Sequence, residues 1–304
     1  ALPSGLPILT AGSDNDFTGE IKIENKTGQT TIGEYKTLSA KRYGKEMRAE
    51  YGYAFAWSRV SAIGTYFSPD LATIFDTIKN DPNNKDTEYR ITVETDVLVG
   101  KLTFPGAYKS LEISSDAEHP DRHTIFFTGD LTMKGSGQTK FERLFLDARN
   151  TAGVSADYKI TASNGDLEMK NVGFNNLTAI TANKQNLALS GVEFGNKPVK
   201  ITSKNFTFTQ VDGLIESLTV DTIKANNFGT QTLRMLEKKQ SKVNVGIDGL
   251  SGYVQFSYCK ADGSVAAIPN KTVLFSVFKG DLSKISTSPC NYTRDARNRI
   301  LAAP

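Results

Sequence analysis

The feature that most constrains the fold of this chain is a short repeat that runs from Gly129 to Ile223. The hexapeptide GDLTMK at 129–134 is nearly repeated as GDLEMK at 165–170, and looser copies follow at 186–191 and 205–210. Counted from their first apolar residue, the last three rows are 20 and 19 residues apart. A period near 20 residues with strand-like alternation is typical of a β-solenoid, in which each turn of the coil packs on the next.

Within the aligned rows, the first, third and sixth positions are apolar, and the second is polar or small. This period of two predicts short strands with one buried face. Because neighbouring turns of a solenoid pair in parallel, like residues should stack, with Phe174 beside Phe194 and Asn186 near Asn205. Corners between strands are predicted at residues that tolerate a left-handed backbone. The apolar positions are Leu167, Leu187 and Phe206, then Met169, Leu189 and Phe208, then Val172, Val192 and Val211, and the corners are Asn171, Gly191 and Gln210.

A helix is predicted just before the repeat. Ser68 is a suitable N-cap, Pro69 fits the first turn and Asp70 complements the helix dipole. Leu71, Ile74, Phe75 and Ile78 then form one apolar stripe, and the polar segment 80–84 ends the helix. Such a stripe needs a surface to cover, so we expect the helix to cap the open end of the coil.

The chain therefore divides into three predicted parts. Residues 1–67 form an N-terminal β arm or small subdomain, and residues 68–242 form the capping helix and the parallel solenoid. Residues 243–304 form a terminal β unit or the last solenoid turns, with a frayed tail. Three local expectations belong to this division: a strand over 50–60, a row of the repeat at 100–104, and a short helix or basic loop at 232–242.

Composition excludes several classes of protein. The net charge of +3 over 304 residues is too small to indicate nucleic-acid binding, and no basic run or zinc-finger spacing is present. No apolar stretch of about 18 residues occurs, so no transmembrane segment is expected. There is no Gly-x-Ser-x-Gly elbow, phosphate-binding loop or dinucleotide fingerprint, so no motif defines a reaction.

Aromatic residues around the single tryptophan are the first candidate for ligand binding. Tyr51, Tyr53 and Trp57 share one face of the predicted strand over 50–60. If exposed, this strip would be a platform on which sugar rings stack. The alternative, which we favour, is a covered core face, since large aromatic residues are mostly buried.

Two acidic residues and two histidines are the candidate metal ligands. Glu193 and Asp212 occupy the same position in neighbouring rows, so their carboxylates would lie one strand spacing apart and could bind Ca²⁺ or shift a pKa. His119 and His123, with Asp121 between them, could hold a divalent metal if their loop folded back. We favour solvent-facing side chains in both cases, and no cofactor other than this Ca²⁺ is suggested.

Cys259 and Cys290 are the only cysteines, and their spacing leaves two alternatives open. They form one disulfide in an oxidising compartment, or they are two buried thiols.

The capping helix and the rows GDLEMKNVGF, NLALSGVEF and NFTFTQVDG resemble the β-helical repeat regions of large bacterial cell-surface proteins, which are relatives of the pectate-lyase-like fold. The resemblance covers roughly residues 68–285. It implies a mainly β protein built as a single-stranded right-handed parallel β-helix, with irregular β structure at both ends. It also implies secretion and display on the cell surface, as a monomer or as a segment of a larger surface protein.

Two functions follow from that resemblance. The first is a non-enzymatic module that binds a polysaccharide, a host surface glycan or a host protein, or that acts as a spacer. The second is a polysaccharide lyase or glycoside hydrolase, for which Arg143, Glu168, Glu193 and Asp212 are the candidate residues. We favour the first, because the sequence contains no catalytic signature, although the scaffold can host both roles.

Overall fold

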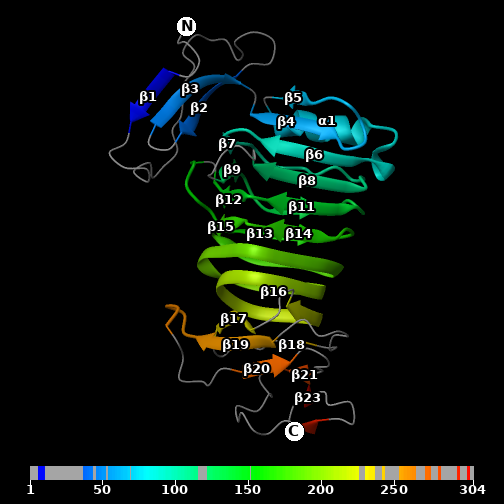
Figure 1. Cartoon of the computed structure of the whole chain (residues 1–304), viewed down its shortest axis with the longest axis vertical. Helices are drawn as coiled ribbons and strands as arrows, with labels where there is room; N and C mark the ends of the chain where they lie inside the picture. The colour runs from blue at the N-terminus through cyan, green and yellow to red at the C-terminus, as the bar shows by residue number, and fades with distance from the viewer. Residues whose placement is uncertain are drawn as a thin grey trace.

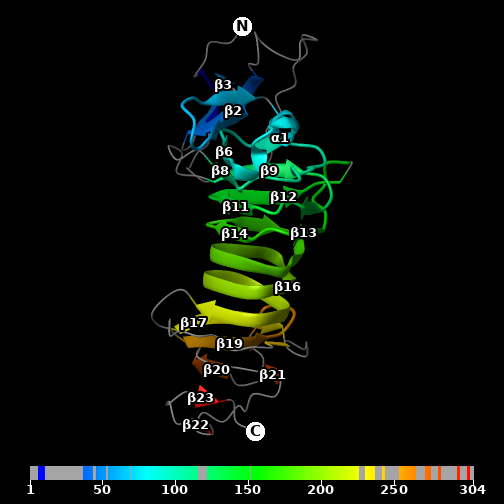
Figure 2. The same ribbon diagram turned by 90° about the vertical axis from the view of Figure 1, so that its right-hand side faces the viewer.

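Short parallel strands stack along the long axis of the molecule, as the alternating pattern predicts (Figures 1 and 2). The protein is mainly β and forms a strongly curled, solenoid-like sheet. The computed structural model describes residues 6–10, 37–43, 46–52, 54–68, 70–115, 122–150, 152–225, 230–236, 242–243, 253–264, 271–274, 280–281, 293–294 and 300–301.

Three ladders of parallel strands run side by side along this coil, and each strand pairs with the one a turn further on. The strand β16 takes part in all three, because it continues through several corners without interruption. The first ladder contains β6 (Glu88–Val93), β8 (Ser110–Ser115), β11 (Gln138–Glu142), β14 (Leu167–Lys170) and part of β16 (Leu177–Ala225). The second contains β7 (Val97–Leu98), β9 (His123–Phe127), β12 (Leu144–Ala148), β15 (Gly173–Asn175) and part of β16. The third contains β10 (Leu131–Met133), β13 (Tyr158–Ala162) and part of β16.

Like residues stack inside the coil, and this confirms the register predicted for the later rows. Leu167 pairs with Leu187, and the two side chains are buried. Phe174 pairs with Phe194 in the second ladder, with ring centroids 6.0 Å apart. All nine apolar positions of the aligned rows are buried, so one continuous core fills the coil.

The corners that follow the first ladder have left-handed backbone, as predicted. Asn171, Gly191 and Gln210 have φ of 53°, 62° and 51°, and Arg143 has the same conformation one turn earlier, at 55°. The Asn171 N–H donates to the carbonyl of Ser190 in the next turn, at 2.7 Å. The corners are therefore hydrogen-bonded to one another along the coil.

Polar side chains also bond from turn to turn. Asn186 donates to Asp166, 20 residues earlier, at 2.8 Å, and Asn205 donates to Asn186 at 2.6 Å. Thr222 continues the row by donating to Asn205 at 2.6 Å. The predicted proximity of Asn186 and Asn205 is thus confirmed, and the amides form a hydrogen-bonded ladder on the outside of the coil.

The first turn is closed by the helix α1 (Leu71–Asn80) and by the antiparallel hairpin of β4 (Phe55–Arg59) and β5 (Tyr66–Ser68). All four residues of the predicted apolar stripe are buried, and Phe75 packs on Phe104 with ring centroids 5.0 Å apart. The strand β4 pairs antiparallel with β6, which covers the edge that the first parallel strand would otherwise expose. The predicted N-cap is wrong by two residues, because Asp70 caps the helix and accepts from the Thr73 N–H at 2.7 Å, whereas Ser68 bonds to Asp70.

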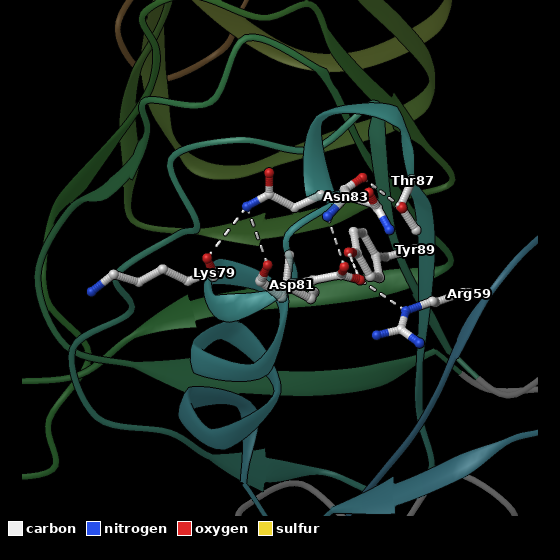
Figure 3. Close-up of polar contacts among 8 residues, drawn as sticks. Arg59, Lys79, Asp81, Asn83, Thr87 and Tyr89 are labelled. Carbon is white, nitrogen blue, oxygen red and sulfur yellow. Dashed lines mark hydrogen bonds and ion pairs between the residues drawn. The ribbon is translucent and has the colours of Figure 1, made fainter.

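A buried carboxylate fastens the end of this helix to the strands beneath it (Figure 3). Asp81 accepts from the Tyr89 hydroxyl at 2.6 Å, from Arg59 Nε at 2.9 Å and from the Asn83 N–H at 3.0 Å. The Tyr89 hydrogen bond, ahead of the Asn83 N–H and the Arg59 charge, holds the pKa of Asp81 below its usual value despite burial. Burial, followed by the hydrogen bond to Asp81, raises the pKa of Tyr89 to about 12. A short 3₁₀ turn, η1 (Asn84–Asp86), joins α1 to β6.

The remaining strands lie at the two ends of the coil. Near the N-terminus, an antiparallel sheet has the order β1-β3-β2, and β4 and β5, although N-terminal to the predicted boundary at residue 67, pair within the large sheet. Near the C-terminus, β17 and β19 continue the parallel stacking. There β20 pairs antiparallel with β19, and β21 pairs antiparallel with β18. These strands are β1 (Leu6–Thr10), β2 (Thr37–Tyr43), β3 (Glu46–Gly52), β17 (Thr230–Leu236), β18 (Lys242–Val243), β19 (Tyr253–Cys259), β20 (Lys271–Leu274), β21 (Gly280–Asp281), β22 (Thr293–Arg294) and β23 (Ile300–Leu301).

Three local predictions are wrong, and a fourth, the strand over 50–60, is confirmed only in part. The GDLTMK copy at 129–134 was aligned with GDLEMK, but Leu131 pairs with Ile160 in the third ladder, whereas Leu167 lies in the first. Residues 100–104 form no strand, although Leu102 and Phe104 are buried. The predicted strand over 50–60 is divided between β3 and β4, and the helix or loop expected from residue 232 begins as part of β17.

Candidate functional site

A hollow of about 580 Å³ opens on the outer face of the first ladder and is lined by residues from the hairpin β4–β5 and from β6, β8 and β11. Its walls are polar and charged, with one large aromatic side chain. The lining residues are Ala56, Thr65, Phe67, Arg90, Thr92, Glu94, Glu112, Ser114, Ser115, Glu142 and Arg143.

The floor of the hollow is a row of small side chains that crosses the strands. Ala56 pairs with Thr92, Thr92 with Ser114, and Ser114 with Glu142. Since neighbouring strands lie about 4.8 Å apart, these three steps span roughly 14 Å along the axis of the coil. Phe67 lies opposite Ala56 on β5 and is 52% exposed, so an aromatic ring stands at one end of the row and a carboxylate at the other.

A second row, beside the floor, alternates in charge. Arg90 pairs with Glu112, Glu112 with Lys140, and Lys140 with Glu168. Arg90 Nε lies 3.3 Å from Glu112, and Lys140 Nζ lies 3.4 Å from the other oxygen of the same carboxylate. Glu168 accepts from Gln138 Nε2 at 3.0 Å. Opposite charges thus occupy neighbouring strands, where like charges would repel.

Glu142 joins the charged row to the floor. It lies 2.5 Å from Lys140 and 2.7 Å from Lys170. Burial favours the neutral carboxyl, but the hydrogen bonds and charges of the two lysines outweigh it, so the pKa of Glu142 is lowered. Burial also opposes the charge on Lys140, but Glu142, Glu112 and Glu168 together raise its pKa. Glu142 is therefore ionised at neutral pH and is not a proton donor there.

This arrangement suits a ligand rich in hydroxyl groups. Serine and threonine hydroxyls, carboxylates and guanidinium groups offer donors and acceptors along the floor, and an exposed ring such as Phe67 can pack on the apolar face of a sugar. The small floor residues form a track of roughly 14 Å between Phe67 and Glu142, beside which a short extended chain can lie.

Of the candidate aromatic platform, the structure describes only the Trp57 side chain. Trp57 is 9% exposed and stacks on Tyr66, with ring centroids 4.8 Å apart, so the core alternative is confirmed for this residue. Tyr53 lies outside the described residues, and Tyr51 is described only by its backbone in β3. The exposed ring of the hollow is instead Phe67, ten residues after Trp57.

The two acidic metal candidates each face an arginine. Arg122 Nη2 donates to both oxygens of Glu193, at 3.0 and 3.1 Å, and Arg234 lies 3.8 Å from Asp212. These arginines supply positive charge at the two positions considered as candidate Ca²⁺ ligands. Of the four candidate enzyme residues, only Arg143 lines the hollow, so the structure does not gather them in one site.

The histidine pair is only partly described. His119 and Asp121 lie outside the described residues, whereas His123 is buried at the start of β9, with Nδ1 3.6 Å from Asp96. Among the residues that the structure describes, no three His, Cys, Asp or Glu side chains are grouped so that they could hold a metal ion.

Cys259 is a buried free thiol at the end of β19. Cys290 lies outside the described residues, so the alternatives of one disulfide and two buried thiols stay open.

Sequence reasoning missed the hollow because its residues come from β4, β5, β6, β8 and β11. The one available signal was charge, because Lys140 lies 28 residues after Glu112 and the signs alternate from turn to turn. No family model, curated protein or solved structure matches the chain. In the described part of the chain, no helix is both long and apolar enough to cross a membrane.

Proposed function

We propose that this protein is a non-enzymatic glycan-binding module, secreted and displayed on a bacterial cell surface. Its scaffold would be a single-stranded right-handed parallel β-helix, in keeping with the resemblance of its repeat to such surface proteins. The observation that carries the proposal is the hollow at the cap end of the first ladder, with its small floor, its exposed ring and its paired charges.

Geometry favours a glycan over a compact ligand. The floor runs along the axis of the coil and crosses four strands, so several units of a linear polymer would fit beside it. Phe67 would stack on one sugar ring, while Thr92 and Ser114 would exchange hydrogen bonds with hydroxyls. Because the charged side chains are held by ion pairs within the protein, little ordering would be needed on binding.

The alternative, a polysaccharide lyase or glycoside hydrolase on the same scaffold, has less support. A hydrolase needs one carboxyl that stays protonated, yet the pKa of Glu142 in the hollow is lowered. Glu193 and Asp212, the proposed Ca²⁺ ligands, do not line the hollow.

The test is a panel of plant, bacterial and host polysaccharides, scored for retention of the protein and for shortening of the polymer, with and without Ca²⁺. Phe67→Ala should weaken retention by up to about ten-fold, the upper range expected for loss of one stacked sugar. Leu98→Ala is the matched control, since Leu98 is 55% exposed on β7 and does not line the hollow.

Retention that Phe67→Ala abolishes and Leu98→Ala leaves intact, without shortening of the polymer, is the expected result. Shortening of any polymer would establish the enzymatic alternative. If Phe67→Ala leaves retention unchanged, the binding surface lies outside the hollow.

A further inference from the structure

The charges that line the hollow also restrict which glycans it can accept. We propose, on the basis of the glycan-binding function above, that the hollow selects uncharged polysaccharides and rejects those that carry carboxylates or sulfates. The inference concerns selectivity at that same site, and it rests on three features of the lining.

The first feature is the balance of charge. Glu94, Glu112 and Glu142 line the hollow, against Arg90 and Arg143. A polymer with one negative charge on every sugar would bring several anions beside these three carboxylates, while Arg90, Lys140 and Lys170 are already engaged with Glu112 and Glu142. Like charges that are brought together across an interface oppose binding strongly.

The second feature is that two nearby basic groups, Arg90 and Lys140, already have carboxylate partners. Arg90 pairs with Glu112, and Lys140 lies between Glu112 and Glu142. Arg90 contacts Glu112 through Nε, and its side chain is 54% exposed, so a ligand carboxylate that reached its other nitrogens would lie beside the Glu112 carboxylate. Repulsion from Glu112 would then offset the attraction to Arg90.

The third feature is the floor. Ala56, Thr92 and Ser114 carry no charge, so a ligand that follows the track meets hydroxyl and methyl groups over three successive strands. These groups can pair with sugar hydroxyls but cannot neutralise an anion. The strongest contacts are thus available only to an uncharged chain.

The experiment compares one linear neutral glucan with the same polymer oxidised to the uronate at C6, so that only the charge differs. Binding of each is measured by titration to the wild-type protein, at low and at high salt. We expect the oxidised polymer to bind at least about ten-fold more weakly at low salt. The difference in affinity between the two polymers should shrink at high salt, because the charges are screened.

Glu112→Gln is the informative variant, because it removes a carboxylate and leaves Arg90 without that partner. It should strengthen binding of the oxidised polymer more than binding of the neutral one. Glu193→Gln is the matched control, since Glu193 does not line the hollow, and it should leave the ratio of the two affinities unchanged.

The possible failures are distinguishable. Equal or tighter binding of the oxidised polymer, lost in Phe67→Ala, would overturn the selectivity while leaving the glycan-binding function in place. If neither polymer binds, and no polysaccharide of the panel binds, both the selectivity and the glycan-binding function are overturned. If Glu112→Gln fails to fold, the salt dependence of the two affinities in the wild-type protein still tests whether charge causes the selectivity.

Discussion

Single residues matter most where one turn of the coil touches the backbone of the next. At Gly165, an added Cβ would lie 1.9 Å from the carbonyl oxygen of Gly137, and at Gly137 it would lie 1.9 Å from that of Tyr108. Neither glycine has a positive φ, so both are required by space and not by backbone conformation. Two successive turns can approach this closely only because both positions lack a side chain.

Gly165→Ala should therefore destabilise the fold by about 1–3 kcal/mol or more, since the backbone must shift to admit the methyl group. The measurement is urea denaturation followed by circular dichroism. Gly106→Ala is the matched control, because nothing lies within 4 Å of a Cβ there, and its effect should stay within about 0.5 kcal/mol. Equal midpoints for the two variants would contradict the close approach of the turns.

At the scale of elements, α1 depends on its first turn and on the carboxylate beyond its last. Asp70 accepts from both the N–H and the hydroxyl of Thr73, each at 2.7 Å. Asp81 connects the far end of the helix to β4 and β6 through Arg59 and Tyr89. The Asp70 bonds thus stabilise the start of the helix, and the Asp81 bonds fasten its end to the sheet.

Loss of the N-cap should be measurable by itself. Asp70→Ala should lower the free energy of unfolding by about 1 kcal/mol, because it leaves first-turn N–H groups without an acceptor. Asp76→Ala, on the exposed face of the same helix, is the control and should have a smaller effect. A larger loss in Asp76→Ala than in Asp70→Ala would show that the capping bond is not what stabilises this turn.

Asp81 should make stability depend on pH in acid. Its pKa is lower in the folded protein than in the unfolded chain, so its contribution is complete above the unfolded value, about 3.9, and is lost as the pH falls through the folded value. Asp81→Asn should be less stable than the wild type at pH 7, with the difference shrinking in acid. Melting temperatures of both proteins from pH 7 to pH 2 test this, and a constant difference would refute it.

Elements were predictable from the sequence where the period is regular. The rows at Leu167 and Leu187 and the stripe of α1 were found because each depends on local spacing alone. The row at Leu131 was misplaced because similar sequence motifs can lie in different ladders when long loops separate the strands. The hollow escaped for the same reason, since its floor depends on the lengths of turns that no local pattern gives.

At the scale of the whole molecule, each turn contacts mainly the turns beside it. Stability should then be transmitted from neighbour to neighbour, and damage at one end should be felt most strongly there. The core itself is continuous, from Phe75 and Phe104 at the cap to Met235 in β17.

Phe75→Ala tests this directly, since it removes the ring that connects α1 to the core. Hydrogen exchange should accelerate first at amides of β6 and β8, while those around Leu187 in β16 change little. Leu189→Ala, which opens a cavity in the middle of the coil, should instead accelerate hydrogen exchange in the turns on both sides of Leu189. Uniform acceleration in Phe75→Ala would show that the coil opens as one cooperative unit.

The alternating row of Arg90, Glu112, Lys140 and Glu168 has a consequence for how such a coil can grow. Duplicating a single turn would set a charge beside its own copy, about 4.8 Å away, where the two repel. Duplicating two successive turns keeps the signs in order. Within these four strands, growth of the coil by copying should therefore favour pairs of turns over single turns.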